Sequence, residues 1–437
     1  MKFLIRNWGP IASAEIDLSK PLIVFTGLNG TGKTYISYLL YGFMSSVGAI
    51  PYTIIQRKMD NRFYEIFHGE ELEKGLPVQV EIDPSQVFNL FQEMLSGKWG
   101  KLVDFFEVSD VSDDLSLTIT STFDEWSKWL FETDLEFGST FKVTKPSSSY
   151  SFKLIPKTDT KINVPFEIAY LYHKLLFQGV YLPYMLTAER SGIYTFSKEI
   201  ALGRLRDANI ASRYPRPIND SLVHAEDLAN DKKYESVFAD LAAQIESDVL
   251  HGKMMITDDG EIQYLHNDKV FSYHYSSTMV KTLSPIIFYL RYKAYDDLLL
   301  IIDEPEINLH PDNQILLARI FARMINAGLH LMIATHSDYI IREVNNLVMA
   351  EALQRKGENI NIKDEYGYDK NELLKALDVA AYSFNLETEG NVKVEELEVN
   401  NYGFDVQSIN AAIEAQNSIT NDLYDRLTYE VTDDGDE

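Results

Sequence analysis

A glycine-rich loop near the N-terminus constrains the fold of this 437-residue chain more than any other feature. The sequence GLNGTGKT (27–34) fits the pattern G-x-x-x-x-G-K-[ST]. It follows an apolar stretch, PLIVFTG (21–27), that is typical of a strand, and TYISYLLYGFM (34–44) continues as a helix. In this arrangement backbone N–H groups turn toward phosphates, Lys33 reaches the β and γ oxygens, and the Thr34 hydroxyl coordinates Mg²⁺. A chance match is the alternative to the nucleotide site that we expect from Asn29, Gly30, Thr31, Gly32, Lys33 and Thr34.

Two carboxylates follow an apolar strand much later in the chain. The segment DDLLLIIDEPEINLHPDNQ (296–314) begins with a continuous apolar run that ends at Asp303 and Glu304. Such a run is typical of a strand inside a parallel sheet, and ligands bind at the carboxyl ends of such strands. We expect Asp303 to hold Mg²⁺ through water and Glu304 to polarise the attacking water. An ordinary strand followed by an acidic helix cap is the alternative.

The next apolar strand, GLHLMIATHSDYI (328–340), places a histidine at its end. Because His336 comes one strand after Asp303 and Glu304, we expect it to contact the γ-phosphate. Capping of the following helix is the alternative role for this side chain.

Between the loop and these strands, YHYSSTMVKTLSPIIFYLRYKA (273–294) has apolar residues at helical spacing. The expected helix begins near Ser276 and Ser277, whose hydroxyls and free N–H groups lie at its positive end and suit an anion. Plain helix capping explains the same two serines equally well.

The amino-acid composition limits the classes of protein to which this chain can belong. Hydrophobic residues make up 45% and charged residues 24%, and there is no cysteine, so the chain reads as a globular cytoplasmic protein without disulfides. Neither a signal peptide nor a membrane span is expected. The formal net charge of −26 would repel nucleic acid at long range, so any DNA contact must be local.

These residues together resemble the ABC-type ATPases of the SMC, RecF and OLD group. They are similar in particular to the AAA family ATPases of bacterial anti-phage defence, such as those of PARIS systems. The resemblance covers about 1–48 and 181–350, and it rests on DEPEINLHP and ATHSDYIIREVNNL, with a hairpin in 2–19 ahead of the loop. It implies an α/β P-loop NTPase of ABC/SMC-head type, with a mixed sheet flanked by helices and ATP and Mg²⁺ as ligands.

The resemblance also implies roles for single residues. Residues 27–34 are then Walker A, Asp303 and Glu304 Walker B, and His336 the switch histidine. Catalysis would depend on Lys33, Glu304 and His336, and Mg²⁺ on Thr34 and Asp303.

A second subunit is implied by the same resemblance. Ser276 and Ser277 would stand for the signature motif that completes the ATP site of the opposite subunit, although Thr278 and Met279 replace the usual glycines. Asn308 and His310 would lie in the D-loop at that interface. ATP hydrolysis would then require a head-to-tail dimer or a larger homo-oligomer.

Three further features leave alternatives open. In LTAERSGIYTF (186–196), Arg190 is a phosphate or partner contact, or it forms a salt bridge with a nearby carboxylate. Both Gln56 and Gln92 are candidates for a Q-loop glutamine. From Arg190 to Arg216, six basic residues outnumber two acidic ones, which fits either a DNA or partner surface or a set of internal ion pairs.

The expected organisation has four parts. Residues 1–48 and 181–350 form the ATPase core, 49–180 an α+β insertion, and 351–437 a C-terminal region with an acidic tail. OLD nucleases carry a Toprim domain after the core, but Glu389-Gly390 lacks a preceding apolar strand and only 47 residues follow Gly390. We therefore expect no nuclease in this chain.

The expected function is an ATP-hydrolysing switch subunit that controls a separate effector, a nuclease or toxin encoded nearby, in anti-phage defence. A RecF-like DNA repair ATPase is the first alternative. The second is a structural scaffold that binds ATP with little turnover.

Overall fold

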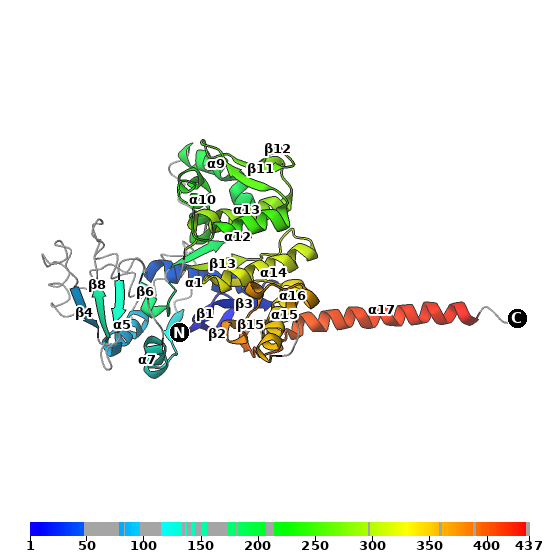
Figure 1. Ribbon diagram of the computed structural model, residues 1–437. Helices are drawn as coiled ribbons and strands as arrows, with labels where there is room; N and C mark the ends of the chain where they lie inside the picture. The colour runs from blue at the N-terminus through cyan, green and yellow to red at the C-terminus, as the bar shows by residue number, and fades with distance from the viewer. Residues whose placement is uncertain are drawn as a thin grey trace.

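The computed structural model describes most of the chain (Figure 1). The described residues are 1–47, 78–82, 84–96, 115–132, 136–137, 141–144, 150–154, 174–180, 182–206, 214–295, 298–357, 361–387 and 390–433. Gln56, Asp207, Arg213 and Glu389 lie outside them.

A mixed nine-stranded sheet forms the centre of the molecule, in the order β5-β1-β2-β16-β15-β3-β14-β13-β9. Its strands are β1 (Lys2–Trp8), β2 (Ile11–Asp17), β3 (Leu22–Gly27), β5 (Ser116–Ile119), β9 (Pro183–Leu186), β13 (Leu299–Asp303), β14 (His330–Ala334), β15 (Val379–Leu386) and β16 (Val392–Leu397). From β15 to β9 the neighbours are parallel, whereas β1 pairs antiparallel with β2 and β5. The carboxyl ends of β3, β14 and β13 therefore meet at one edge of the sheet.

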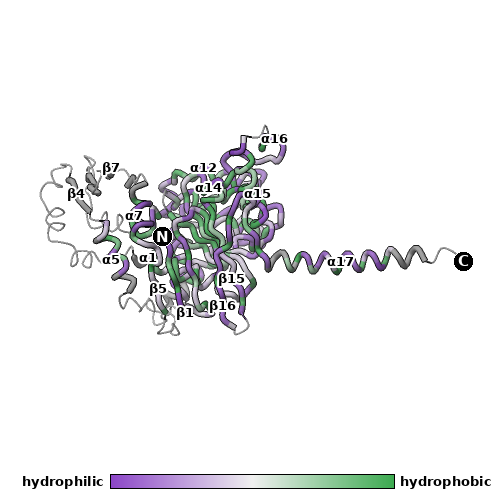
Figure 2. Tube along the Cα trace, turned by 90° about the horizontal axis from the view of Figure 1, so that it is seen from below, coloured by the Kyte–Doolittle hydropathy of each residue, from purple (hydrophilic) through white to green (hydrophobic). Residues whose placement is uncertain are grey.

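The strands beside the loop are apolar on both faces because helices cover both sides of the sheet. On β3, Ile23 and Phe25 pack on one side with α1 (Lys33–Val47), while Leu22 and Val24 pack on the other with α14 (Pro311–Asn326) and α15 (Asp338–Arg355). The apolar strands gather in the interior in Figure 2. The strands expected at 21–27 and from Leu298 are confirmed as β3 and β13, and so is the helix after the loop. The strand expected in 328–340 is β14, which ends at Ala334, and residues 338–340 already belong to α15.

A helical lobe with its own small sheet lies beside the central sheet (Figure 1). Its helices are α9 (Arg190–Arg206), α10 (Arg216–Glu226), α11 (Leu228–Asp231), α12 (Ala239–Ile245) and α13 (Thr278–Phe288), with π-helical turns at Glu246–Leu250 and Tyr289–Lys293. Its antiparallel sheet contains β10 (Lys253–Ile256), β11 (Ile262–His266) and β12 (Lys269–Ser272). The helix expected within 273–294 is α13, and it packs against α9 and α12.

The expected insertion contains both helices and strands. A four-stranded antiparallel sheet joins β4 (Val78–Ile82), β6 (Glu136–Phe137), β7 (Phe141–Thr144) and β8 (Tyr150–Leu154), near α5 (Pro84–Ser96) and α7 (Phe123–Glu132). The fifth strand of this segment, β5, pairs instead with β1 in the central sheet. The range 49–180 therefore supplies an edge of the ATPase sheet.

The division at residue 350 does not follow the sheet. Strands β15 and β16 come after it, and β15 lies parallel to β3 inside the central sheet because VAAYSFNL is buried along most of its length. The expectation that no apolar strand precedes Glu389-Gly390 is wrong, since β15 ends at Leu386.

The C-terminal helix α17 (Gln407–Asp433) projects from the body of the molecule (Figures 1 and 2). Ile419, Leu423 and Leu427 recur every four residues along it and are more than half exposed. The remaining short elements are α16 (Ile362–Tyr366) and the 3₁₀ turns Tyr273–Tyr275, Lys370–Glu372 and Ala376–Asp378. Among the described residues no helix is both long and apolar enough to cross a membrane.

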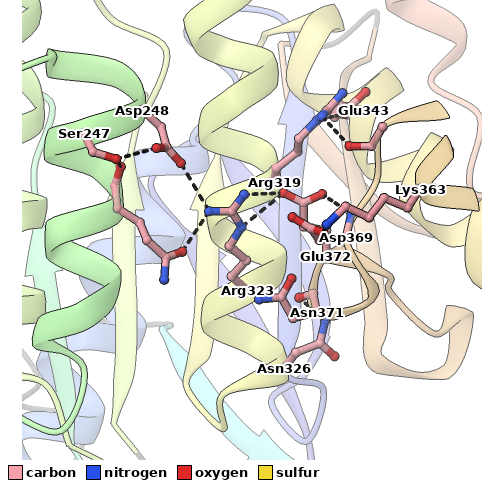
Figure 3. Close-up of polar contacts among 12 residues, drawn as sticks. Ser247, Asp248, Arg319, Arg323, Asn326, Glu343, Lys363, Asp369, Asn371 and Glu372 are labelled. Carbon is pink, nitrogen blue, oxygen red and sulfur yellow. Dashed lines mark hydrogen bonds and ion pairs between the residues drawn. The ribbon is translucent and has the colours of Figure 1, made fainter.

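A buried polar network joins α14 to the segment that leads into β15 (Figure 3). Arg323 donates to Glu372 Oε1 from Nη2 at 2.6 Å and from Nε at 3.1 Å, and Nη1 donates to Gln244 Oε1 at 2.8 Å. The Glu372 side chain is 2% exposed. The network fixes residues 370–378, from which β15 enters the sheet beside the loop.

Replacing Glu372 by Gln is expected to lower the free energy of unfolding by about 2 kcal/mol, because the 2% exposed carboxylate is the better buried of the two acidic partners of Arg323, and the other, Asp248 at 3.5 Å, is 44% exposed. Asp422→Asn breaks a pair on α17 whose side chains are 74% and 62% exposed, so its effect should stay below about 1 kcal/mol. Urea unfolding of the two variants measures the difference. Equal losses of stability would contradict a role for burial in this network.

Candidate functional site

The loop after β3 contains glycines where the backbone or its surroundings demand them. Gly27 lies opposite Phe384 of β15, and a Cβ at Gly27 would come within 2.4 Å of the Phe384 carbonyl oxygen. Gly30 and Gly32 have φ values of 75° and 88°, in the region that favours glycine. These positions let the chain leave the sheet and enter α1 in a tight loop.

Lys33 lies at the start of α1 with its side chain folded back over the loop. Its Nζ donates to the carbonyl oxygens of Gly27 at 3.0 Å and Leu28 at 2.8 Å. Burial lowers the pKa of Lys33, and the charges of Asp303, Glu304 and Glu306 oppose that shift. The ammonium is therefore a positive group near these three carboxylates, and among the described residues its acceptors are main-chain carbonyls, which a phosphate can replace.

Thr34 and Asp303 meet although 269 residues separate them in sequence. The Thr34 hydroxyl donates to Asp303 Oδ2 at 2.7 Å. Two adjacent oxygen ligands of this kind fit Mg²⁺, which keeps several waters and takes its other ligands from phosphates. Within the described ranges no group of three or more His, Cys, Asp or Glu side chains could hold a metal ion. When bound, Mg²⁺ would neutralise charge on the β- and γ-phosphates.

Asp303→Asn is expected to stabilise the nucleotide-free protein while abolishing Mg²⁺-dependent turnover. Burial raises the pKa of Asp303 from 3.8 to about 6, although the hydrogen bond from Thr34 opposes the shift. At neutral pH the ionised carboxylate therefore costs the fold about 3 kcal/mol, which the amide removes.

This gain should be fully present above about pH 6 and should disappear below about pH 4, where the carboxyl is protonated in both the folded and unfolded states. Thermal unfolding at several pH values measures the gain. The exposed Asp425→Asn on α17 is the control, and a stability gain at pH 7 no larger than that of Asp425→Asn would contradict the prediction.

Glu304 follows β13 in a turn that brings its carboxylate to His336. The residue has a φ of 48°, and its N–H donates to the Ala334 carbonyl at 2.9 Å. Glu304 Oε1 lies 3.1 Å from His336 Nε2, and the two side chains are 35% and 31% exposed. A water molecule can therefore reach both side chains.

His336 is held by a third carboxylate that the sequence reasoning did not assign. The main-chain N–H of His336 donates to Glu306 Oε1 at 2.7 Å. Helix α15 is capped by Ser337, which accepts a hydrogen bond from the Ile340 N–H at 3.1 Å, so His336 is not the helix cap. The signal for Glu306 was present in DEPEINLHP, where it is the next carboxylate after Glu304.

The structure thus brings five predicted side chains to the carboxyl edge of β3, β13 and β14. They are Lys33, Thr34, Asp303, Glu304 and His336. This arrangement can hold a phosphate chain and a divalent cation beside a carboxylate and an imidazole.

The two predicted signature serines lie elsewhere, at the start of α13 in the helical lobe. Ser277 accepts a hydrogen bond from the Val280 N–H at 3.3 Å, so helix capping is an observed role. The Ser276 hydroxyl donates to the Ser272 carbonyl at 3.2 Å. Helix α13 itself packs on α9 and α12 of the helical lobe.

The two predicted D-loop residues are exposed and follow the Walker B segment. Asn308 has a φ of 58°, and His310 caps α14, with Nδ1 accepting from the Asp312 N–H at 3.4 Å. Asn313 of α14 also contacts Met279 of α13 at 3.0 Å. Asn308 and His310 are therefore open to a partner, and the α14 helix that follows them contacts α13, whose N-cap is Ser277.

Arg190 forms no direct ion pair with a carboxylate among the described residues. Its side chain is buried and all its described hydrogen bonds go to main-chain carbonyl oxygens. The salt bridge considered for it is wrong, because the nearby acidic residues present their carbonyls and not their carboxylates.

The rest of the basic segment is partly accounted for by ion pairs. Lys198 pairs with Glu261 at 2.5 Å, and Arg216 pairs with Asp220 at 3.4 Å. For Lys198 and Arg216, these contacts favour internal ion pairs over a DNA-binding surface. Gln92, a Q-loop candidate, is exposed on α5.

Comparison with known proteins agrees with this geometry. Residues 205–341 match a family described as "AAA ATPase domain". No curated protein sequence matches the chain.

Several solved structures of SMC heads are similar over most of the chain. The Smc head bound to the C-winged helix domain of ScpA is 10% identical, with 91% of this chain and 97% of that one covered and a TM-score of 0.38. The Smc head with an extended coiled coil, bound to the C-terminal domain of ScpA and derived from Pyrococcus furiosus, is 11% identical (96% and 98% covered, TM-score 0.36). The SMC head domain from Thermotoga maritima is 10% identical (91% and 98% covered, TM-score 0.33).

The family match and the observed sheet confirm the expected fold class. The chain has an α/β fold in which helices flank a mixed sheet and a P-loop joins β3 to α1, and residues 205–341 match an AAA ATPase domain. An ATPase of this broad class is therefore supported.

Proposed function

We propose that the chain is an ATP-binding and ATP-hydrolysing switch subunit that assembles with copies of itself and controls a separate effector. The observation that carries the hydrolytic part is the 3.1 Å contact between Glu304 and His336 beside the Thr34–Asp303 pair. A half-exposed carboxylate next to an imidazole is suited to orienting a water toward a phosphate. Glu304, His336 and Lys33 act on ATP in this proposal, and Thr34 and Asp303 hold Mg²⁺.

The proposed site is completed by a second copy. Ser276 and Ser277 lie on a different lobe from Lys33, at a helix N-terminus that attracts anions. Ser277 and Asn308 are exposed, as a contact between copies requires. A head-to-tail dimer would place the start of α13 of one copy against the nucleotide of the other, so assembly and hydrolysis would be linked.

The effector part of the proposal rests on the C-terminal helix and on the resemblance to defence ATPases. Helix α17 leaves Ile419, Leu423, Tyr424 and Leu427 more than half exposed on a helix that projects from the body. The charged side chains of α17 are acidic apart from Arg426, and the tail TDDGDE (432–437) is acidic as well. A partner with an apolar groove and a basic rim would fit, and we propose a nuclease or toxin encoded nearby, in anti-phage defence.

The test is purification of the chain from its native operon, with and without ATP, followed by identification of associated proteins and measurement of the oligomeric mass. The proposal expects a second protein whose retention depends on nucleotide and is lost in Leu423→Asp. Leu377→Asp, at a residue that is 78% exposed on a 3₁₀ turn, is the matched control.

Three results would each overturn part of the proposal. Absence of any associated protein in either nucleotide state removes the effector role. Salt-sensitive DNA binding that is lost on reversing Arg204 and Arg206 favours a RecF-like DNA repair ATPase. Oligomer growth with ATP that is unaffected by Glu304→Gln favours a scaffold with little turnover.

A further inference from the structure

Arg190 lies at a junction of three segments and satisfies its donors with main-chain oxygens. Its side chain is 1% exposed. Nη1 donates to the carbonyl oxygens of Asp303 at 2.8 Å and Thr187 at 3.2 Å. Nη2 donates to those of Glu304 at 3.0 Å and Pro305 at 3.4 Å, and Nε donates to that of Thr282 at 3.3 Å. One planar group therefore joins the end of β9, the turn after β13 and the middle of α13.

A guanidinium suits this junction because it has five N–H donors in a rigid plane. Burial lowers the pKa of Arg190 to about 10, so the group keeps its charge at neutral pH. The nearby charges of Asp303, Glu306 and Glu304 oppose the lowering and compensate a cation in a dry site. A lysine would keep the charge but offers three donors from one atom, which cannot reach all of these carbonyls.

The turn that Arg190 holds is the one that aims the proposed catalytic carboxylate. Glu304 adopts a φ of 48°, which is uncommon for a residue with a side chain. Arg190 binds the carbonyls of three consecutive residues across this turn, Asp303 to Pro305. Loss of these bonds would let the turn relax and move the Glu304 carboxylate away from His336.

The remaining bond connects the turn to the helix that begins with the signature-like serines. Thr282 lies in α13, whose N-cap is Ser277. In the first turn of α13 the Lys281 N–H donates to the Ser277 carbonyl at 3.1 Å and the Val280 N–H to the Ser277 hydroxyl at 3.3 Å, so a displacement of Ser277 is passed to the residue next to Thr282. A shift of α13 on contact with a partner's nucleotide would therefore reach Arg190, and through it the turn that carries Glu304.

We propose that Arg190 is a positioning residue that couples α13 to the turn carrying Glu304, so that the placement of the carboxylate depends on what the N-terminus of α13 contacts. This inference rests on the proposed ATPase function. Arg190 itself touches no substrate and acts through the backbone of Asp303–Pro305.

The test compares Arg190→Lys with Arg291→Lys in the full-length protein. Arg291, in the π-helical turn after α13, is also buried, at 7% exposure, and it bonds the Glu246 carboxylate and the Met254 carbonyl, neither of which belongs to the turn carrying Glu304. We expect Arg190→Lys to lower kcat about 10-fold to 100-fold with KM for ATP within about threefold, because a misplacement of about 1 Å at a reacting group has effects of this size. Arg291→Lys should leave kcat within about twofold even if both variants lose similar stability.

Two further readouts separate positioning from a merely structural role. Arg190→Ala should regain about tenfold in kcat when millimolar guanidinium is added, because the free cation can occupy the vacated site. Hydrogen exchange should accelerate in Arg190→Lys both at the Glu304 N–H and at the Val280 N–H in the first turn of α13. This exchange measurement needs no turnover.

The outcomes distinguish this inference from the proposed function. If wild type shows no Lys33-dependent turnover, the proposed function fails and the exchange experiment alone decides the coupling. If wild type hydrolyses ATP but Arg190→Lys matches Arg291→Lys in kcat, the positioning role is wrong. Faster exchange at the Glu304 turn without any change in α13, or no change at either place, would also overturn the coupling.

Discussion

Glu304→Gln is expected to lower ATP turnover at least about 100-fold while ATP binding is retained. The amide has the size of the carboxylate and can still accept a hydrogen bond from His336, so the site should keep its shape. It cannot polarise an attacking water, which is the role that the 3.1 Å contact with His336 Nε2 supports. Turnover at saturating ATP and the dissociation constant for ATP, measured on the same preparation, give the two quantities.

Glu365→Gln is the matched control for this substitution. Glu365 lies exposed on α16, so the variant loses the same charge without any contact to the site. Because Glu304→Gln should bind ATP without consuming it, it should also favour the nucleotide-bound oligomer over the dissociated chain. Turnover within about threefold of wild type would contradict the assignment and would make the scaffold alternative the better account.

The central strands could be predicted because burial on both faces of the sheet requires apolar residues at nearly every position. Strands β3, β13 and β14 are covered on both faces, so each reads as an unbroken apolar run. The side chains at their carboxyl ends were also predicted, since phosphate, magnesium and water each require particular residue types. The structure brings five of these side chains together, as the pattern implied.

The position of β15 in the central sheet could not be predicted from its own residues. It is inserted between β16 and β3, and its partner β3 lies more than 350 residues away along the chain. Nothing local in VAAYSFNL specifies that partner, because parallel pairing is decided by long-range packing. The boundary at 350 and the supposed lack of a strand before Gly390 both failed for this reason.

The contacts of Arg190 escaped prediction for a different reason. Its acceptors are main-chain carbonyls, which every residue has, so no pattern of side chains in the sequence predicts these contacts. A salt bridge with a nearby carboxylate was one alternative for Arg190, but the turn at Glu304 presents carbonyl oxygens to it. A buried arginine next to a functional turn is therefore a stronger clue to backbone support than to ion pairing.

Lys33→Ala is expected to raise the dissociation constant for ATP by roughly 100-fold, about 2.7 kcal/mol. Lys33 is the ammonium that faces Asp303, Glu304 and Glu306, as the effect of these residues on its pKa indicates. Without it, the phosphates of ATP would approach three carboxylates at the loop with one cation fewer, so repulsion adds to the lost contact. Lys20→Ala removes the same charge from a lysine that bonds the Leu377 carbonyl at 2.7 Å, and its affinity should match that of wild type. Calorimetric titration of both variants measures the effect, and equal affinities would place the nucleotide outside the loop 27–34.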